Sequence, residues 1–287
     1  MSDQLLNKLA SEQPTFSVEL WPPRSEAAKT RLEEALSVLR GLAPDFVSIT
    51  YGAGGSTRER THELVRDLKA QGWTIPMAHL TCAAHTTAQL QAILHAYRDI
   101  GVNHILALRG DPPLDATAPL SDGELLYASE LVRLAKDTGD FCVAVAVHPE
   151  GHPQSASPEE DRKYLSQKLA AADFGITQFY FEADKYSAIL ADLDSRNIVR
   201  PIVPGVMVPA SWKSLLKMSE LSGTAIPPRL LERFERFADD PESLRKAGVE
   251  VAVGLAKRAL ADGAPGVHVY SMNSSASTAE IYAAVFG

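Results

Sequence analysis

The sequence predicts a (β/α)8 barrel, an α/β fold built as a single domain over residues 1–287. Three observations favour it. Eight short apolar runs are bounded by Pro, Gly or Asp, segments with helical spacing separate them, and the runs are too continuously apolar to leave one face in water. A doubly wound sheet is the main alternative, but its glycine-rich phosphate turn would follow the first strand, where this chain has WPPR.

The eight predicted strands are rich in β-branched and aromatic residues, as buried parallel strands are. They are residues 16–20 (FSVEL), 45–51 (DFVSITY), 75–80 (IPMAHL), 104–108 (HILAL), 141–147 (FCVAVAV), 176–181 (ITQFYF), 200–206 (RPIVPGV) and 266–270 (GVHVY). The first of them is expected to open the first ordered segment of the chain, with residues 1–14 as an N-terminal extension.

The segments between the strands have the periodicity of amphipathic helices. After the first strand, Leu32, Ala35, Leu36 and Leu39 recur at spacings of three and four residues, and Ser25 stands where a helix cap is expected. The stretch 208–262 is longer than one helix, and its prolines predict a division into two or three helical pieces of the same domain.

Composition excludes several classes of protein. The net charge of −8 at pH 7 and the pI near 5.5 argue against nucleic acid or an anionic membrane as the main partner. No apolar run approaches the roughly 18 residues of a membrane span, so a cytoplasmic location is expected. Cys82 and Cys142 lie in or beside apolar runs as free thiols, and their spacing predicts neither a disulfide scaffold nor a zinc site.

One glycine cluster, YGAGGSTRERT at 51–61, follows the second strand. Gly52 and Gly54 match the start of a dinucleotide fingerprint, but Thr57 occupies the third glycine position, so the match is weak. A strand, a flexible turn and a helix start in this order suit an anion held by backbone N–H groups, or an ordinary tight loop.

Polar residues gather at the predicted C-terminal ends of the strands, the face that carries the active site in barrel enzymes. They are Glu19, Thr50, His79, Arg109, Asp111, His148, His152, Gln178, Tyr270 and Asn273. Structural explanations exist for single members: Thr50 is an ordinary strand residue, His79 could be a satisfied core histidine, and Arg109 with Asp111 could form an internal ion pair.

Glu19 is the most informative of these residues, because an unpaired carboxylate in an apolar strand costs several kcal/mol. It is either paired, for example with Arg109, or used in chemistry. His148 and His152 lack a third ligand at metal-site spacing, so no metal is expected. Since nucleophile elbows and Walker motifs are absent from the sequence, cofactor-assisted redox chemistry is favoured.

Seven motifs in order carry a resemblance to a known family: FSVELWPPR, DFVSITYGAGGSTRERT, HLTC, LALRGDPP, HPEGHP, ITQFYF and HVYSMN. From about residue 16 to its end, the chain resembles methylenetetrahydrofolate reductase of the bacterial type. The resemblance implies a (β/α)8 barrel that holds FAD, is reduced by NADH or NADPH, and converts 5,10-methylenetetrahydrofolate to 5-methyltetrahydrofolate in two alternating half-reactions.

The resemblance also assigns roles. Glu19 matches the catalytic glutamate that protonates the folate, and Asp111 matches the aspartate that tunes the flavin and favours a cationic folate intermediate. Substrate contacts map onto Gln178, Met218 and Asn273. Cofactor contacts map onto Thr50, His79, Leu108, Arg109, Gly110, His148, His152, Asp161 and Lys168, with Arg109 and Lys168 offsetting the pyrophosphate charge.

The chain departs from the family at four positions. Leu20 and Trp21 replace two phenylalanines, His148 replaces a tyrosine that often packs on the flavin, and Met218 stands where some relatives place an aromatic residue against the nicotinamide.

Three alternatives therefore remain open. One is direct hydride transfer from NADH to the folate without flavin, another is a barrel that binds folate or flavin without turnover, and the third is another flavin barrel of the proline dehydrogenase kind. Because the chain ends after STAEIYAAVFG, regulation by S-adenosylmethionine is not expected. The bacterial family members are commonly oligomeric, which is compatible with a homo-oligomer here.

Overall fold

The computed structural model describes residues 3–52, 58–110 and 123–287. Its strands are β1 (Thr15–Leu20), β2 (Phe46–Ile49), β3 (Ile75–Thr81), β4 (His104–Leu108), β5 (Cys142–Val147), β6 (Phe174–Thr177), β7 (Ile202–Val203), β8 (Gly205–Met207) and β9 (Gly266–Tyr270). Its helices are α1 (Gln4–Leu9), α2 (Glu26–Leu42), α3 (Arg58–Gln71), α4 (Thr87–Asp99), α5 (Ala128–Thr138), α6 (Pro158–Ala171), α7 (Asp184–Ser195), α8 (Trp212–Ser222), α9 (Pro228–Glu235), α10 (Pro241–Ala261) and α11 (Ser275–Val285).

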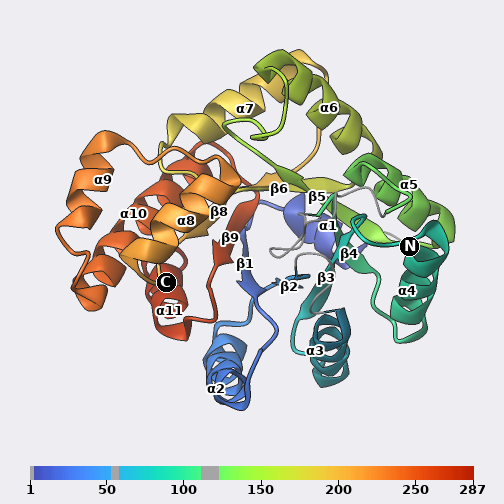
Figure 1. Ribbon diagram of the computed structural model, residues 1–287, viewed down its shortest axis with the longest axis horizontal. Helices are drawn as coiled ribbons and strands as arrows, with labels where there is room; N and C mark the ends of the chain where they lie inside the picture. Colours follow the sequence, from blue (N-terminus) through green and yellow to red (C-terminus); the bar gives the residue numbers. More distant parts are fainter. Residues whose placement is uncertain (1–2, 53–57, 111–122) are drawn as a thin grey trace.

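The strands form one parallel sheet in the order β7-β6-β5-β4-β3-β2-β1-β9-β8, which curls into a barrel with helices around its outside (Figure 1). Within the described residues, nine strands fill eight barrel positions, because β7 and β8 share the seventh. Pro204, which has no N–H to donate, separates them. β7 pairs with β6 and β8 pairs with β9, so the two short strands close the ring. The predicted barrel is confirmed.

One predicted strand was misplaced. The sixth strand was expected at 176–181, but β6 covers Phe174–Thr177 and ends before Gln178. The aromatic residues that follow are buried outside the ladder: Phe179 and Phe181 pack against Phe234 in a cluster under α8 and α9. The apolar run at 176–181 therefore predicted correctly that these residues are buried, but it did not predict where the strand ends. The division of 208–262 into several helices, α8, α9 and α10, is confirmed.

Alternate residues of each strand face opposite sides of the barrel wall. On β2, Val47 and Ile49 belong to the large cluster between strands and helices, while Phe46 belongs to a second cluster inside the barrel. On β3, Leu80 lies in the outer cluster and Met77 in the inner one. This alternation points residues such as Glu19 and His79 into the barrel.

The N-terminal helix α1 closes the bottom of the barrel, where the strands begin. Leu5 and Leu9 are buried in the inner cluster with Phe46 and Phe174, and Figure 1 shows α1 at the centre of the ring of strands. Asp3 caps this helix by accepting hydrogen bonds from two backbone N–H groups. The expectation that ordered structure starts at residue 16 was wrong, because an amphipathic segment of only six residues gives little periodic signal.

In the part of the chain that the structure covers, no helix is both long and apolar enough to cross a membrane.

Candidate active site

Glu19 lies at the carboxyl end of β1 and points into the mouth of the barrel. Its side chain is 12% exposed, and its Oε1 accepts a hydrogen bond from Nε1 of Trp21 at 3.0 Å. Burial raises the pKa of Glu19 to about 7, and the hydrogen bond from Trp21 opposes this rise. The carboxyl group can therefore carry a proton near neutral pH.

His79, which points into the barrel from β3, does not neutralise the negative charge of ionised Glu19. Its Nε2 lies 3.8 Å from Oε2 of Glu19, but burial lowers the pKa of His79 to about 3, so the imidazole is uncharged at pH 7. Arg109, the partner considered from sequence, instead donates a hydrogen bond to Oε1 of Gln154. Among the described residues, no lysine or arginine forms an ion pair with Glu19.

A buried, hydrogen-bonded polar network lies beneath the carboxyl group. His268 sits between the hydroxyls of Ser17, at 2.9 Å from Nδ1, and Ser48, at 3.2 Å from Nε2, and burial lowers its pKa to about 3. Tyr270, the strand neighbour of Glu19 on β9, donates its O–H to the Thr177 carbonyl at 2.6 Å. Burial and the nearby Glu19 raise the pKa of Tyr270, which stays a neutral donor.

Asn273 holds the segment that follows β1. Its Oδ1 accepts from the backbone N–H of Trp21, and its Nδ2 donates to the Trp21 carbonyl, both at 2.9 Å. The hydroxyl of Ser271 donates to the Glu19 carbonyl at 2.6 Å. These contacts fix Trp21 so that its indole N–H reaches the carboxyl group. A direct contact of Asn273 with substrate stays a prediction.

Gln178 directly follows β6 at the same end of the barrel. Its backbone N–H donates to the Val147 carbonyl at 2.7 Å, and its Oε1 accepts from the Phe179 N–H at 2.9 Å. The side-chain NH2 makes no hydrogen bond within the residues described, so it remains available to a ligand. Met218, on α8, packs in the neighbouring cluster that includes Phe179 and Tyr270.

Within the described residues, three buried polar atoms at the ends of β3 and β4 have no hydrogen-bond partner: Nε2 of His79, Oγ1 of Thr81 and Nε of Arg109. Gly110 follows with φ at +88°, and a Cβ there would lie 2.9 Å from Cβ of Thr81. Buried polar groups are rarely left unsatisfied. This edge of the mouth, where Leu108 also ends its strand, therefore suits a polar, hydrogen-bonding ligand.

A second part of the predicted cofactor set lies after β5. The rings of His148 and His152 meet edge to face with centroids 4.8 Å apart, and burial lowers the pKa of His148 to about 3. Asp161 accepts from the His152 backbone N–H at 2.9 Å, which ties this loop to α6. Lys168 donates to the Ala146 carbonyl at 2.6 Å, and burial lowers its pKa to about 8.

The structure thus brings most predicted site residues to one end of the barrel. Thr50 lies there too, held by a bond from its N–H to the Leu20 carbonyl at 3.0 Å. Asp111, Gly54 and Thr57 lie outside the described residues. Sequence reasoning missed two features: Trp21 as the donor to Glu19, and Thr81, whose spacing of two from His79 on a strand would have indicated the same face.

Fold and site together define a class: a (β/α)8-barrel enzyme whose mouth holds a protonatable carboxyl group beside unsatisfied polar groups. Residues 4–285 match the family model described as methylenetetrahydrofolate reductase. The chain belongs to this family and is an oxidoreductase of that type.

Curated relatives agree. The 5,10-methylenetetrahydrofolate reductase of Escherichia coli is 34% identical over 274 residues, covering 94% of this chain and 91% of that protein. Its counterpart from Pectobacterium carotovorum is 33% identical over 258 residues, covering 90% and 85%. The family resemblance seen in the motifs is confirmed.

A solved structure supports the fold. An uncharacterized protein from Clostridium thermocellum, described as binding two copies of 5-methyl-5,6,7,8-tetrahydrofolic acid, superposes with a TM-score of 0.67 over 97% of both chains. At 15% sequence identity, this likeness shows the shared barrel alone.

Proposed function

We propose that this protein reduces 5,10-methylenetetrahydrofolate to 5-methyltetrahydrofolate with NAD(P)H as reductant, through a bound FAD, with Glu19 as the general acid. The observation that carries the proposal is the Glu19 carboxyl group, buried at the barrel mouth with a pKa of about 7 and no cationic partner among the described residues. A pKa near the working pH gives a group that is protonated often enough to act and acidic enough to donate.

The acid has a defined task in this reaction. Opening the methylene bridge leaves a lone pair on a folate nitrogen, and Glu19 would donate its proton there while the bridge carbon becomes an electrophilic iminium. The Trp21 N–H, at 3.0 Å from Oε1, would stabilise the carboxylate that remains. Neutral His79 adds no positive charge that would lower the pKa of Glu19 and leave it ionised.

The residues at the ends of β3 and β4 fit a flavin. Atoms Nε2 of His79, Oγ1 of Thr81 and Nε of Arg109 would meet the polar edge of the ring, and the Lys168 side chain places a buried amine near Asp161 on the adjoining side. When bound, FAD would supply hydride transfer between NAD(P)H and the folate, which enter in turn.

The remaining assignments follow the family pattern. The Gln178 side-chain NH2 would contact whichever substrate occupies the mouth, and Asp111 would favour the cationic folate intermediate. Thr50, Leu108, Gly110, His148, His152 and Asp161 would line or support the flavin, with Met218 and Asn273 on the substrate side.

Visible absorption spectra of the purified protein test this proposal. Flavin bands that bleach with anaerobic NADH or NADPH and return with methylenetetrahydrofolate are expected, together with parallel double-reciprocal lines for the two substrates. A colourless protein that oxidises NADH with folate would instead favour direct hydride transfer. A yellow protein that is reduced by NADH but never reoxidised by folate would favour a different flavin barrel. A protein that shows neither flavin reduction nor folate reduction would favour a barrel that only binds folate or flavin.

Glu19→Gln separates the acid from the cofactor. The variant should retain reduction of the flavin by NAD(P)H, while folate-dependent reoxidation should fall by about 10²–10⁴-fold, the usual contribution of a general acid. Equal rates of reoxidation in the variant and the parent protein would show that Glu19 is not the acid.

A further inference from the structure

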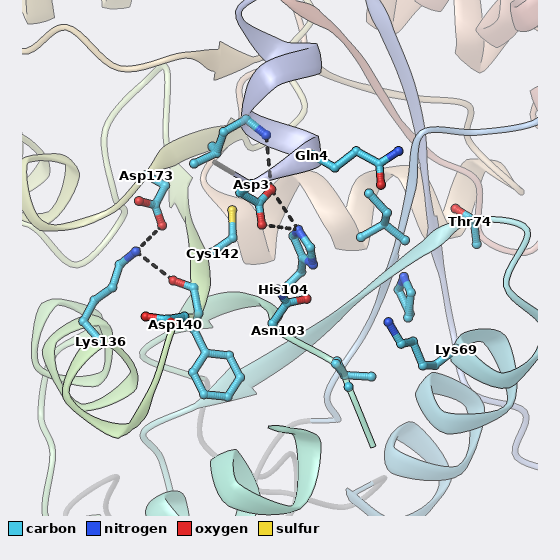
Figure 2. Close-up of a pocket in the computed structure, with 16 residues that line it drawn as sticks. Asp3, Gln4, Lys69, Thr74, Asn103, His104, Lys136, Asp140, Cys142 and Asp173 are labelled. Carbon is cyan, nitrogen blue, oxygen red and sulfur yellow. Dashed lines mark hydrogen bonds and ion pairs between the residues drawn. The ribbon is translucent and has the colours of Figure 1, made fainter. Parts of the chain in front are cut away.

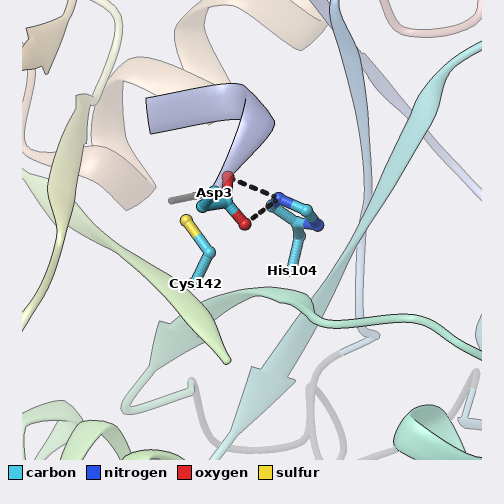
Figure 3. Close-up of side chains that lie close together, drawn as sticks. All are labelled: Asp3, His104 and Cys142. Carbon is cyan, nitrogen blue, oxygen red and sulfur yellow. Dashed lines mark hydrogen bonds and ion pairs between the residues drawn. The ribbon is translucent and has the colours of Figure 1, made fainter. Parts of the chain in front are cut away.

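A second group of chemically active side chains lies at the opposite end of the barrel, where the strands begin. Asp3 precedes α1, His104 begins β4 and Cys142 begins β5 (Figure 3). They border a pocket of about 740 Å³ whose rim also carries Lys69 and Asp140 (Figure 2). Since parallel strands place their first residues at one end and their last at the other, this pocket is remote from Glu19.

The three side chains converge closely. Nε2 of His104 lies 3.1 Å from Oδ2 and 3.2 Å from Oδ1 of Asp3, and the candidate ligand atoms of all three residues lie within 4.8 Å of one another. Two ligands that share one tetrahedral Zn²⁺ at bond lengths of about 2.0–2.1 Å stand roughly 3.3–3.4 Å apart. The aspartate and histidine need to separate only slightly to reach this distance, and a shift of about 1 Å would bring in the Cys142 sulfur, whose ideal spacing is about 3.5 Å.

Hydrogen bonding inside the protein does not account for all three groups. Oδ1 of Asp3 caps α1 by accepting from the Leu5 and Leu6 N–H groups, which leaves Oδ2 directed at His104. The Cys142 side chain is buried, at 3% residue exposure, and its thiol makes no hydrogen bond within the described residues. Figure 3 shows its sulfur directed toward Asp3.

We propose that Asp3, His104 and Cys142 form a binding site for one divalent transition-metal ion of the zinc type. Imidazole nitrogen, thiolate sulfur and carboxylate oxygen are together the donor set of zinc and its borderline neighbours, whereas calcium and magnesium take oxygen ligands. The ion would join the floor helix α1 to β4 and β5, and its fourth position would open toward the pocket for water.

Charge and protons balance in this arrangement. The ion would bind neutral His104 through Nε2, the Asp3 carboxylate and the Cys142 thiolate, so that two negative ligands neutralise the dication. The thiol proton leaves to solvent on binding. Two nearby lysines already have acidic partners, because Lys136 is paired with Asp173 and Lys8 with Asp45.

The spacing of possible ligands in the sequence did not indicate this site, and the sequence predicted no zinc site. The three residues come from separate segments, and His104 lies 101 positions after Asp3 in the sequence. Short motifs such as paired cysteines arise when ligands share one loop. Here the closure of the barrel and the docking of α1 bring the ligands together.

The test is zinc binding by the full-length purified protein after treatment with a chelator and desalting. Titration with Zn²⁺ against a colorimetric indicator should give one tightly bound ion per chain, and Co²⁺ should give tetrahedral absorption bands at wavelengths beyond those of oxidised flavin. Cys142→Ser should weaken zinc binding at least about tenfold, since loss of even an outer partner of a metal ligand costs 10–100-fold.

Cys82→Ser is the matched control, because Cys82 is the other buried free thiol and contacts the Tyr127 carbonyl away from the pocket. It should leave zinc affinity unchanged. Asp3→Asn provides a second variant that keeps the helix cap, because asparagine caps helices as well as aspartate. It too should weaken binding. Zinc that binds equally to the parent protein and to Cys142→Ser or Asp3→Asn, or that does not bind at all, would overturn the proposal and leave Asp3 and His104 as a structural ion pair for α1.

Discussion

The most informative perturbation is Glu19→Gln, examined through stability as well as catalysis. The free carboxyl group has a pKa of 4.5 and the folded one about 7, because burial disfavours its charged form. A carboxyl group whose pKa is raised by folding favours the folded state below pH 4.5, and this advantage is lost as pH rises through 7. Ionised Glu19 therefore lowers the stability of the folded protein at and above neutral pH.

The magnitude follows from the two pKa values. At 1.36 kcal/mol for each pH unit between 4.5 and about 7, ionisation of Glu19 costs about 3 kcal/mol of folding free energy. Glutamine keeps the shape of the side chain and an oxygen that can accept from the Trp21 N–H, but it never ionises. The variant should therefore match the parent protein near pH 4.5 and be more stable by about 3 kcal/mol at pH 8.

The assay is urea unfolding of both proteins at a series of pH values, at fixed protein and flavin concentrations because bound ligand adds stability by mass action. The difference in unfolding free energy should rise between pH 4.5 and 7 and level off above. Glu33→Gln, which changes an exposed glutamate on α2, is the control and should give no such rise. A difference that stays constant from pH 5 to 8 would refute the argument that burial raises the Glu19 pKa.

Three further substitutions test other parts of the structure. Trp21→Phe removes the N–H that stabilises ionised Glu19, so the pKa of Glu19 should rise. The rate of folate-dependent flavin reoxidation, measured by stopped flow, should then fall at a higher pH than in the parent protein. An unchanged midpoint of this pH profile would count against the role of Trp21. Gly205→Ala would place a Cβ 2.4 Å from Cε2 of Tyr270, and urea unfolding should report a loss of about 1–3 kcal/mol, whereas neutrality would mean that the barrel closure relaxes freely. Leu5→Ala should cost about 2–5 kcal/mol if α1 is an integral floor of the barrel, and a near-zero cost would show that the helix is loosely attached.

Much of the fold could be predicted because its signals are local. Apolar runs and helical spacing are properties of short windows, and seven of the eight predicted strands have counterparts at nearly the predicted residues. The exceptions involve tertiary effects. The run at 176–181 is apolar because Phe179 and Phe181 pack beneath helices, and the strand at the seventh position is divided at Pro204 while still closing the ring.

The candidate site divides in the same way. The ends of the first and third strands could be located from sequence, so Glu19 and His79 could be assigned to one face of a barrel. Gln178 was assigned to the same face, although its strand ends earlier than predicted. Their partners could not be predicted. Arg109 was the evident cation for Glu19, yet the structure gives Glu19 an indole donor from Trp21, because the Trp21 backbone is held by Asn273 at the far end of the chain.

The sequence by itself determined the periodicities, the barrel class, the family motifs and the position of a carboxyl group at the end of the first strand, since each depends on residues close together in the chain. Only the tertiary structure decided how deeply Glu19 is buried, and hence its pKa, and which side chains meet across the barrel. The meeting of Asp3, His104 and Cys142 has the same origin. Burial and contact between distant segments depend on the detailed geometry of the closed sheet, which no local pattern specifies.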